Sequence, residues 1–234
     1  RAVERIERAI RARERVLVQG DYDVDGITST FLLVTTLRSL GGLAAPRIPH
    51  RTLDGYGLTV AAVDAAARND VRLIVTVDCG ITATEAVDHA RTLGIDVVVT
   101  DHHQPGPALP AALAVVNPIR PGCGYPFKSL AGVGVTFKLV QSLLERSGVG
   151  ERAFEALDLV ALGTIADVVP LVGENRVLAR HGLERLSSTS RPGLRALMDV
   201  AGLGDRRVTA THVAFLLAPR HNAAGRMGHA EQAL

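Results

Sequence analysis

The chain is poor in several residue types, and each scarcity narrows what the protein can be. Tryptophan is absent and aromatic residues make up 3% of the 234 residues, so an extended aromatic platform for stacking bases is not expected. The two cysteines are too few for a disulfide framework and do not have a zinc-ligand spacing. We therefore expect a reducing, cytoplasmic location. Because no apolar run approaches the roughly 18 residues that cross a bilayer, no membrane association is expected.

Lysine is scarce as well, with two residues against 24 arginines, a bias that we attribute to genomic composition. The formal net charge of +2 neither requires nor excludes a nucleic-acid partner, because a local basic patch would be enough. The 47% of apolar residues can form one large core or two small ones. The first residue is Arg rather than Met, and we expect the sequence to be a piece of a longer protein.

Short β-branched runs alternate with helical stretches in the first half of the chain. Buried strands are expected at residues 16–19, 47–50, 73–77, 97–100 and 114–116. Helices are expected at 27–40 and 60–68, and another should begin at Thr82, which forms a capping-box pattern with Glu85 and precedes a stop at Gly94. This alternation predicts a doubly wound α/β fold, with a five-stranded, mainly parallel sheet flanked by helices.

The pattern changes near residue 119, after which the periodicity is almost wholly helical. Further helices are expected at residues 135–146, 153–165, 176–186, 194–200 and 211–217. We therefore divide the chain into a sheet core with metal motifs, residues 1–118, and a helical part of the same catalytic core, residues 119–234.

Three acidic motifs follow three of the expected strands. They are Asp21-Tyr22-Asp23-Val24-Asp25-Gly26, Asp78-Cys79-Gly80 and Asp101-His102-His103. The carboxyl ends of parallel strands gather along one edge of a sheet, so these motifs should meet there. Crowded carboxylates repel each other unless a cation lies between them. The sequence therefore predicts a metal site.

Other interpretations of each motif are weaker. The spacing of Asp21, Asp23 and Asp25 copies the start of a calcium-binding EF-hand loop, but Leu32 stands at the twelfth position, where that loop needs Glu. If the segment is extended, Asp23 and Asp25 face the same way. Asp78 alone would more often be a helix cap than a ligand.

The paired histidines are harder to explain without a metal. One imidazole of such a pair is a natural ligand, and Asp101 would orient it from behind. Oxygen ligands with one imidazole suit Mn²⁺, with Mg²⁺ as a weaker substitute. Two such ions, roughly 3.5–4 Å apart, can hold a phosphate for attack by hydroxide.

The motifs GDYDVDG, VDCG, TDHH and GTIADVVP occur here in the order seen in the DHH phosphoesterase superfamily, which this sequence resembles. Within that superfamily it is most similar to the RecJ-type single-strand exonucleases. Further stretches of similarity are HRTLDGYGL, NPIRPGCGYPFKSLAGVGVTFKL and PRHNAAGRM. The resemblance covers residues 16–228.

The resemblance implies a role for each matching residue. Asp23 and Asp78 would hold one Mn²⁺ with Asp21 nearby, and Asp25, Asp78, His102 and Asp167 would hold a second. His103 would face the scissile phosphate, and with Asp78 it forms the catalytic pair. The residues implied in substrate-phosphate binding are Arg51, Arg220, Asn222 and Arg226.

The implied activity is Mn²⁺-dependent hydrolysis of single-stranded DNA from its 5′ end to 5′-mononucleotides, in DNA repair and recombination. A monomer is expected, with a single-strand-binding protein and a helicase as candidate partners. The C-terminal substrate-binding domains of such enzymes are absent from these 234 residues.

Three alternatives remain open. A related enzyme could cleave short RNA or cyclic dinucleotides with the same residues. A manganese pyrophosphatase is disfavoured, because it would carry His at position 21 and a lysine-rich pocket. A replication scaffold that had lost its ligands is also disfavoured, because every expected ligand is present.

Overall fold

The structure, a computed structural model, describes residues 1–50 and 55–227, with side chains in these ranges up to residue 223. Five strands form one sheet in the order β2-β1-β3-β4-β5, and every neighbouring pair is parallel. The expected fold class is confirmed. The strands are β1 (Arg15–Gln19), β2 (Leu43–Arg47), β3 (Val71–Val77), β4 (Asp96–Thr100) and β5 (Ala114–Val116).

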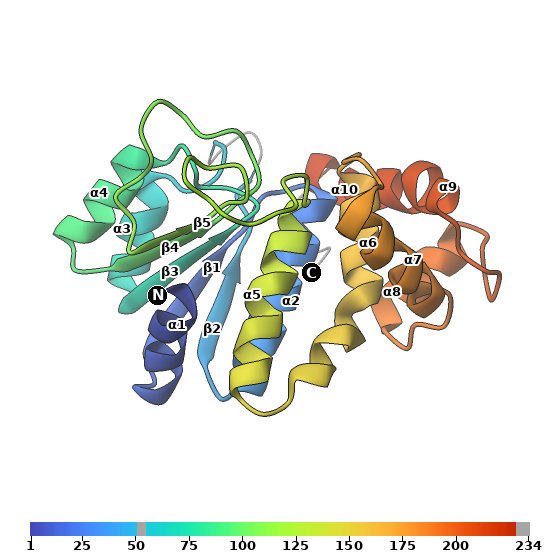
Figure 1. The fold of residues 1–234 in the computed structure, drawn as a ribbon, viewed down its shortest axis with the longest axis horizontal. Helices are drawn as coiled ribbons and strands as arrows, with labels where there is room; N and C mark the ends of the chain where they lie inside the picture. Colours follow the sequence, from blue (N-terminus) through green and yellow to red (C-terminus); the bar gives the residue numbers. More distant parts are fainter. Residues whose placement is uncertain (51–54, 228–234) are drawn as a thin grey trace.

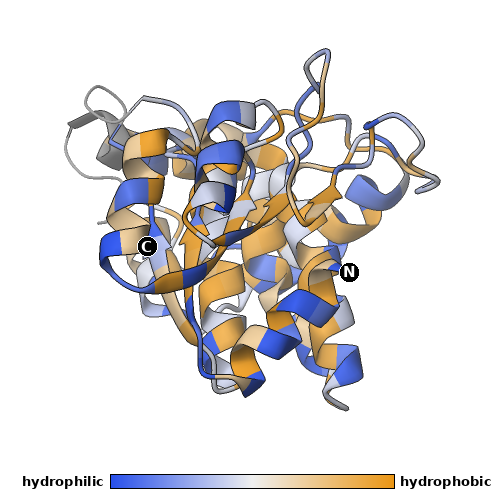
Figure 2. Ribbon diagram, turned by 90° about the vertical axis from the view of Figure 1, so that its left-hand side faces the viewer, coloured by the Kyte–Doolittle hydropathy of each residue, from blue (hydrophilic) through white to orange (hydrophobic). Residues whose placement is uncertain are grey.

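Helices cover both faces of the sheet (Figure 1). On one face lie α1 (Ala2–Arg11), α2 (Val24–Ser39) and α5 (Gly132–Arg146), which share a core with the strand residues Val16, Val18 and Val75. On the other face lie α3 (Val60–Arg68) and α4 (Thr84–Thr92), packed on Leu17 and Ile74. The hydrophobic strands between the two helix layers are visible in Figure 2.

The helices that follow α5 stand beside the sheet rather than over it (Figure 1). Helix α6 is central among them, is buried from Leu157 to Ile165, and packs on α2 and α7. It joins two cores, because Leu157 and Val160 belong to the core under α2 and α5, and Leu162 and Ile165 belong to a separate one. In the described residues beyond β5 there is no further strand. The remaining elements are η1 (Gly150–Ala156), α6 (Leu157–Ala166), α7 (Gly173–Ser187), α8 (Pro192–Val200), α9 (Ala210–His212), η2 (Val213–Leu217) and α10 (Ala218–Met227).

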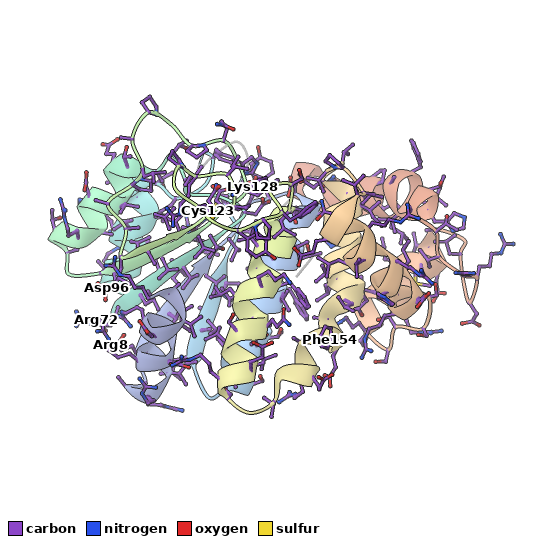
Figure 3. All side chains as sticks on the ribbon, viewed as in Figure 1. Arg8, Arg72, Asp96, Cys123, Lys128 and Phe154 are labelled. Carbon is purple, nitrogen blue, oxygen red and sulfur yellow. The ribbon has the colours of Figure 1, made fainter. Side chains whose placement is uncertain are left out.

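Polar contacts fasten α1 and the loop after β5 to the sheet (Figure 3). The buried Arg5 donates to Asp96 Oδ2 at 2.5 Å, and Arg8 donates to the same oxygen at 3.1 Å. At the opposite end of the strands, Lys128 Nζ donates to the carbonyl of Cys123, and Asn117 Nδ2 donates to the carbonyl of His103. These contacts hold that loop next to the Asp101-His102-His103 segment.

The second strand was expected at residues 47–50, and this prediction is wrong: β2 runs from Leu43 to Arg47. Its sequence, LAAPR, has low intrinsic strand propensity, so local preference gives no signal. Pairing with β1 imposes the extended conformation, and Pro46 is tolerated because β2 is an edge strand.

The prediction of a capping box formed by Thr82 and Glu85 is also wrong. Helix α4 begins at Thr84, its N-cap is Ala83, and it has no side-chain cap. Gly80, at φ +101°, starts a tight turn in which Ala83 N donates to the Gly80 carbonyl. That turn places Thr82 ahead of the helix. The expected stop is observed, since α4 ends at Thr92 and Gly94 has φ +70°.

Two of the predicted helices are observed, but each contains a turn that is not α-helical. The stretch expected as a helix over 153–165 opens as the 3₁₀ helix η1 before α6 begins at Leu157. The helix expected over 211–217 belongs to a helical run from Ala210 to Met227, in which η2 is a π-helix. Pro219 has no N–H and would clash in a regular helix interior, and the wider π turn just before it gives its ring room.

None of the helices in the described part of the chain combines the length and apolarity of a membrane span.

Candidate metal centre

The acidic motifs lie where the strand order reverses. The chain leaves β1 for β2 on one side, whereas β3 leads to β4 on the other, so β1 and β3 flank the crevice at their carboxyl ends. In doubly wound sheets, ligands bind at this switch point. Asp21 follows β1, Asp78 follows β3 and Asp101 follows β4. Residues up to 80 positions apart therefore meet because of strand order alone.

The first motif is not extended throughout, as the sequence reading assumed. Helix α2 begins at Val24, three residues earlier than expected, so Asp23 is its N-cap and Asp25 lies in its first turn. Asp23 Oδ1 accepts from Gly26 N at 3.0 Å, which closes the turn. Because a helix begins between them, Asp23 lies close to Asp21 and Asp78, whereas Asp25 lies close to His102 and Asp167. Gly26 is required here, because a Cβ at that position would lie 2.6 Å from Asp21 Cβ.

Asp25 is held by the start of a helix from the other part of the chain. Its two carboxylate oxygens accept from Gly132 N at 2.7 Å and from Val133 N at 2.8 Å, both in the first turn of α5. Free backbone N–H groups and the helix dipole at such an end favour negative charge. The sequence reading missed this partner, although the pattern Gly132-Val133-Gly134 could have signalled a close backbone approach.

Asp78 is almost fully buried, with 1% of its side chain exposed, and it adopts a left-handed backbone conformation at φ +59°. It does not cap α4, which begins six residues later. The carboxylate lies against α5, where a Cβ added at Gly132 would overlap Asp78 Oδ1. A strained residue in a tightly enclosed position is typical of functional sites.

Asp101 orients the second histidine rather than the first. Its Oδ1 accepts from His103 Nδ1 at 2.7 Å and from the backbone N–H groups of His102 and His103, and its Oδ2 accepts from Ile81 N. These bonds outweigh burial and hold the pKa of Asp101 below its ordinary value, and they raise the pKa of His103. The Asp101–His103 contact therefore favours the ionised form of both side chains.

His102 faces three carboxylates instead. Its Nε2 lies 3.1 Å from Asp78 Oδ1, 3.6 Å from Asp167 Oδ2 and 3.8 Å from Asp25 Oδ2. Burial, and then the neighbouring His103, lower the pKa of His102 to about 4, so its imidazole is neutral at pH 7. Asp167 reaches this point from the C-terminal end of α6.

Three of these converging atoms have no hydrogen-bond partner among the described residues: Asp78 Oδ1, His102 Nε2 and Asp167 Oδ2. Buried polar atoms are seldom left unsatisfied, and each costs about 1–3 kcal/mol when it is. A neutral imidazole nitrogen and carboxylate oxygens are all electron-pair donors. A cation would satisfy them together, so these residues fit a divalent metal.

The ligand atoms fall into overlapping groups whose members lie within 4.8 Å of one another. One group holds Asp21, Asp23 and Asp78, and another holds Asp25, His102 and Asp167. A third combines Asp78 with both histidines. Asp78 lies between the groups, as a residue shared by two ions would.

Burial and mutual repulsion raise the pKa values of the carboxyl groups. Burial lifts the pKa of Asp21 to about 6 and that of Asp167 to about 7, with a further contribution from Asp23 in each case. Burial, then the neighbouring carboxylates, hold the pKa values of Asp25 and Asp78 well above the ordinary range. A divalent cation would reverse these shifts and release protons as it bound.

Residues 15–164 match the DHH family, N-terminal domain. The chain belongs to the DHH family. It is 47% identical over 233 residues to the single-stranded-DNA-specific exonuclease RecJ of Bacillus subtilis, a match that covers 100% of this chain and 29% of that protein. It is 47% identical to the RecJ of Escherichia coli, over 97% of this chain and 41% of that protein. The chain thus spans well under half the length of these relatives.

A solved structure of exonuclease RecJ bound to manganese has the same fold. The TM-score is 0.90 and the sequence identity 43%, over 99% of this chain and 58% of that one. The DHH residues that name the family correspond to the Asp101-His102-His103 segment at the end of β4.

The structure places the expected substrate residues unevenly. Asn222 lies next to the Asp21–Gly26 motif, where its Oδ1 accepts from Val24 N at 3.0 Å. Arg220 is exposed, and its guanidinium donates to the Leu216 carbonyl of its own helix. Arg226 belongs to α10, and Arg51 lies outside the described residues.

Two further residues close to the centre were missed by sequence reasoning. His221 is half-buried, and its Nδ1 has no hydrogen-bond partner among the described residues. Burial lowers the pKa of its imidazole, and the nearby Asp23 carboxylate opposes that shift. Tyr56 packs edge-on against the His103 ring, with centroids 6.2 Å apart. Both belong to stretches matched to the RecJ-type subgroup, but neither residue type is unusual enough to stand out in one sequence.

Proposed function

We propose that this protein is a Mn²⁺-dependent phosphodiesterase that hydrolyses single-stranded DNA from its 5′ end to 5′-mononucleotides, in DNA repair and recombination. The observation that carries the proposal is the convergence of unpartnered atoms from Asp78, His102 and Asp167 at the switch point of the sheet. The choice of single-stranded DNA is supported by the relatives named as single-stranded-DNA-specific exonucleases.

Two ions would be held by two sets of ligands, one of Asp21, Asp23 and Asp78 and the other of Asp25, His102 and Asp167. Asp78 would also serve the second ion, because its Oδ1 lies 3.1 Å from His102 Nε2. When bound, such ions supply Lewis-acid activation of the phosphate and of the attacking water. Asp25 and Asp78 are fixed by backbone contacts in advance, so little rearrangement is needed to form the site.

His103 would act on the substrate directly. Its side chain is 44% exposed, and its bond to Asp101 raises the pKa of the imidazole, which favours the positively charged form. A fixed positive charge stabilises the negative charge that grows on a phosphate during hydrolysis. Arg51, Arg220, Asn222 and Arg226 would bind substrate phosphates farther along the strand.

The proposal extends to the organisation of the protein. Residues 1–118 and 119–234 act as two parts of one catalytic core, with substrate-binding domains elsewhere in the longer protein. The protein acts in the cytoplasm as a monomer, with a single-strand-binding protein and a helicase as candidate partners. Mg²⁺ would replace Mn²⁺ with lower activity.

The test is product analysis with 5′-labelled single-stranded DNA, duplex DNA, short RNA and a cyclic dinucleotide, each with Mn²⁺ or Mg²⁺. Labelled mononucleotide from single-stranded DNA alone supports the proposal. Preferential cleavage of RNA or of the cyclic dinucleotide would assign the protein to the alternative substrates.

Loss of all activity calls for a second measurement, because binding groups elsewhere in the longer protein could be needed for turnover. Calorimetric titration with Mn²⁺ then separates an enzyme core from a scaffold. A core binds the metal and Asp78→Asn abolishes binding, whereas a scaffold binds no metal tightly in either form.

A further inference from the structure

None of the residues that the structure describes covers a groove on the far side of the β1–β2 pair from α2. It has a volume of about 760 Å³ and lies between helix α3 and strand β2. Its floor includes Leu17 of β1 with Leu43 and Ala45 of β2, and its wall includes Ala62 and Ala66 of α3. It contains none of the proposed metal ligands.

The β2 part of this floor is a sheet face that no described element covers, whereas Leu17 is already buried beside α3. Leu43 and Ala45 are exposed, whereas Ala44, which points to the opposite face, is buried under α2 and its neighbours. Leu43 has 41% of its surface exposed. Parallel sheets are normally covered on both faces, so an open apolar face of this kind indicates a binding surface.

The edge of β2 is closed to strand addition. Arg38 Nε donates to the Ala44 carbonyl at 2.9 Å, and Pro46 has no N–H to offer. The outward-facing backbone groups of an edge strand are thus partly consumed or missing. A partner would have to lie on the face of the sheet.

The charges around the groove have one sign. Its lining includes Arg15, Arg38 and Arg47 and no acidic residue. Among the residues that the structure describes, Arg15 and Arg38 pair with carbonyl oxygens, at Asn69 and Ala44, and with no carboxylate. Their full charges therefore remain available to a partner.

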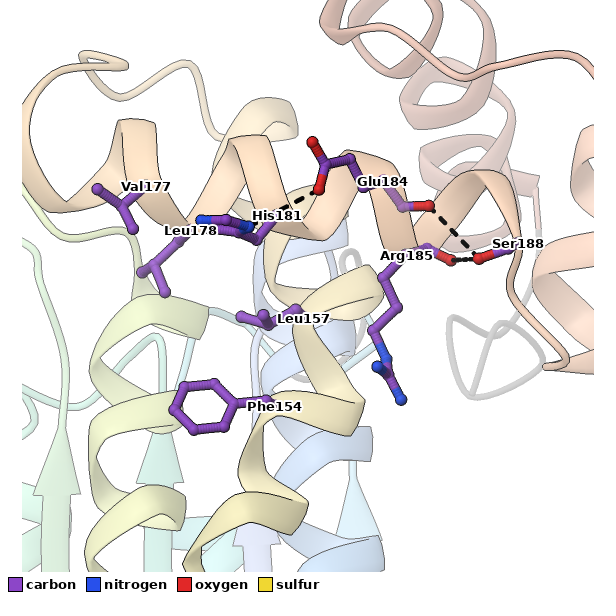
Figure 4. Close-up of a pocket in the computed structure, with 8 residues that line it drawn as sticks. All are labelled: Phe154, Leu157, Val177, Leu178, His181, Glu184, Arg185 and Ser188. Atoms are coloured by element: carbon purple, nitrogen blue, oxygen red, sulfur yellow. Dashed lines mark hydrogen bonds and ion pairs between the residues drawn. The ribbon is translucent and has the colours of Figure 1, made fainter.

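A second hollow shows that this bias is not general. The cavity of about 540 Å³ between η1 and α7, floored by Phe154 and Leu157, is also apolar (Figure 4). Its rim, however, carries Glu184 together with His181 and Arg185, and His181 Nδ1 lies 3.7 Å from Glu184 Oε2. That cavity has no preference for one charge.

We propose that the groove formed by Arg15, Leu17, Arg38, Leu43, Ala45 and the alanine face of α3 binds an acidic segment of a partner protein. Apolar side chains of the segment cover Leu43 and Ala45, and its carboxylates pair with Arg15 and Arg38. A nucleic-acid strand would bring phosphates to the arginines but would leave the apolar floor uncovered. Arg15 also begins β1, one strand length away from the metal centre, so the surface is separate from the proposed active site.

The probe is a fluorescent synthetic peptide in which Asp and Glu surround two leucines, measured by anisotropy against this protein. Two matched peptides replace the leucines by Ser, or the acids by Lys. The first peptide should bind about tenfold tighter than either control, because both burial and charge contribute. Equal binding of the Ser peptide would reduce the surface to a charge patch and overturn the proposal. Competition by oligothymidylate of equal charge would overturn it in favour of nucleic acid.

Two variants locate the site. Ala45→Asp places a carboxylate on the exposed floor, and Arg15→Glu reverses one rim charge; each should weaken peptide binding by about tenfold. The matched control is Arg180→Glu, an exposed arginine on α7, which should bind as the parent does. Thermal melting verifies that each variant is folded. Unchanged binding in folded Ala45→Asp and Arg15→Glu would exclude this groove.

Discussion

The two parts of the chain contribute to the candidate metal centre in different ways. The sheet part supplies Asp21, Asp23, Asp25, Asp78 and His102 from loops that directly follow strands. The helical part supplies one ligand side chain, Asp167, and the two backbone N–H groups of Gly132 and Val133 that hold Asp25. The sheet part therefore supplies most of the charged side chains. The helical part holds Asp25 in place and adds Asp167.

This difference has a physical origin. Parallel strands bring their carboxyl ends to one edge whatever their helices do, so ligands placed there meet by topology. A helix end reaches the same edge only if the helix packs correctly, as α6 does against α2. We expect substitutions in the sheet part to remove chemistry, and substitutions in the helical part to weaken metal binding in a graded way.

The largest effect should come from Asp78→Asn. The carboxylate lies between both ligand groups, so its loss should lower kcat/KM by about 10³-fold or more, equivalent to about 4 kcal/mol. Asn tolerates the left-handed backbone of Asp78, so the fold should be retained. The control is Asp70→Asn, an exposed aspartate with φ +55°, which should be fully active. Near-parental activity of Asp78→Asn would contradict the shared-ligand role.

Asp167→Asn should have a smaller effect, because it removes one ligand of a single group. We expect about a 10²-fold loss of kcat/KM and a weaker Mn²⁺ affinity by calorimetry. Asp205→Asn, at an aspartate with 92% of its side chain exposed, serves as control. A loss as large as that of Asp78→Asn would show that the helical part contributes chemistry as well, and would break the distinction.

Gly132→Ala tests the positioning role of α5. The added Cβ would overlap the Asp78 carboxylate, and overpacking of this kind costs about 1–3 kcal/mol. We expect the Mn²⁺ dissociation constant to rise by about tenfold while all ligands remain. Gly193→Ala, in the first turn of α8 with open space around it, should change neither affinity nor stability. If Gly132→Ala binds Mn²⁺ normally, α5 does not fix the carboxylate.

The last prediction concerns pH and is measured on stability rather than on activity. Asp21 and Asp167 have pKa values of about 6 and about 7 in the folded protein, above those of an unfolded chain. The folded state therefore binds more protons, and its stability falls as pH rises from about 4 to about 7, by about 1.4 kcal/mol per unit of pKa shift.

Thermal melting with EDTA should accordingly give a lower Tm at about pH 7.5 than at about pH 5.5, and Mn²⁺ should stabilise the protein most at the higher pH. The matched control is Asp21→Asn combined with Asp167→Asn, which should lose part of the difference, because the raised pKa values of Asp25 and Asp78 remain. A metal-free Tm that rises between the two pH values would contradict the raised carboxyl pKa values.

What the sequence determined by itself follows from local pattern and parallel-sheet topology. The β-branched runs predicted four of the five strands closely, and Ala114–Val116 is the same in both. The acidic motifs after those runs predicted which residues of the sheet part meet at one edge, because any residue that follows a parallel strand reaches the same edge. The strand LAAPR could not be predicted, since only its pairing with β1 makes it extended.

Only the tertiary structure decided which of those residues group together and which further residue joins them. Asp23 and Asp25 separate because a helix begins between them, and the cap that starts it depends on Gly26. Asp101 orients His103 and leaves His102 to the carboxylates, a choice that two adjacent histidines do not reveal. Asp167 joins them only through the packing of α6 on α2. The positions of most strands are encoded in the local hydrophobic pattern, whereas helix packing depends on contacts between residues far apart in the chain.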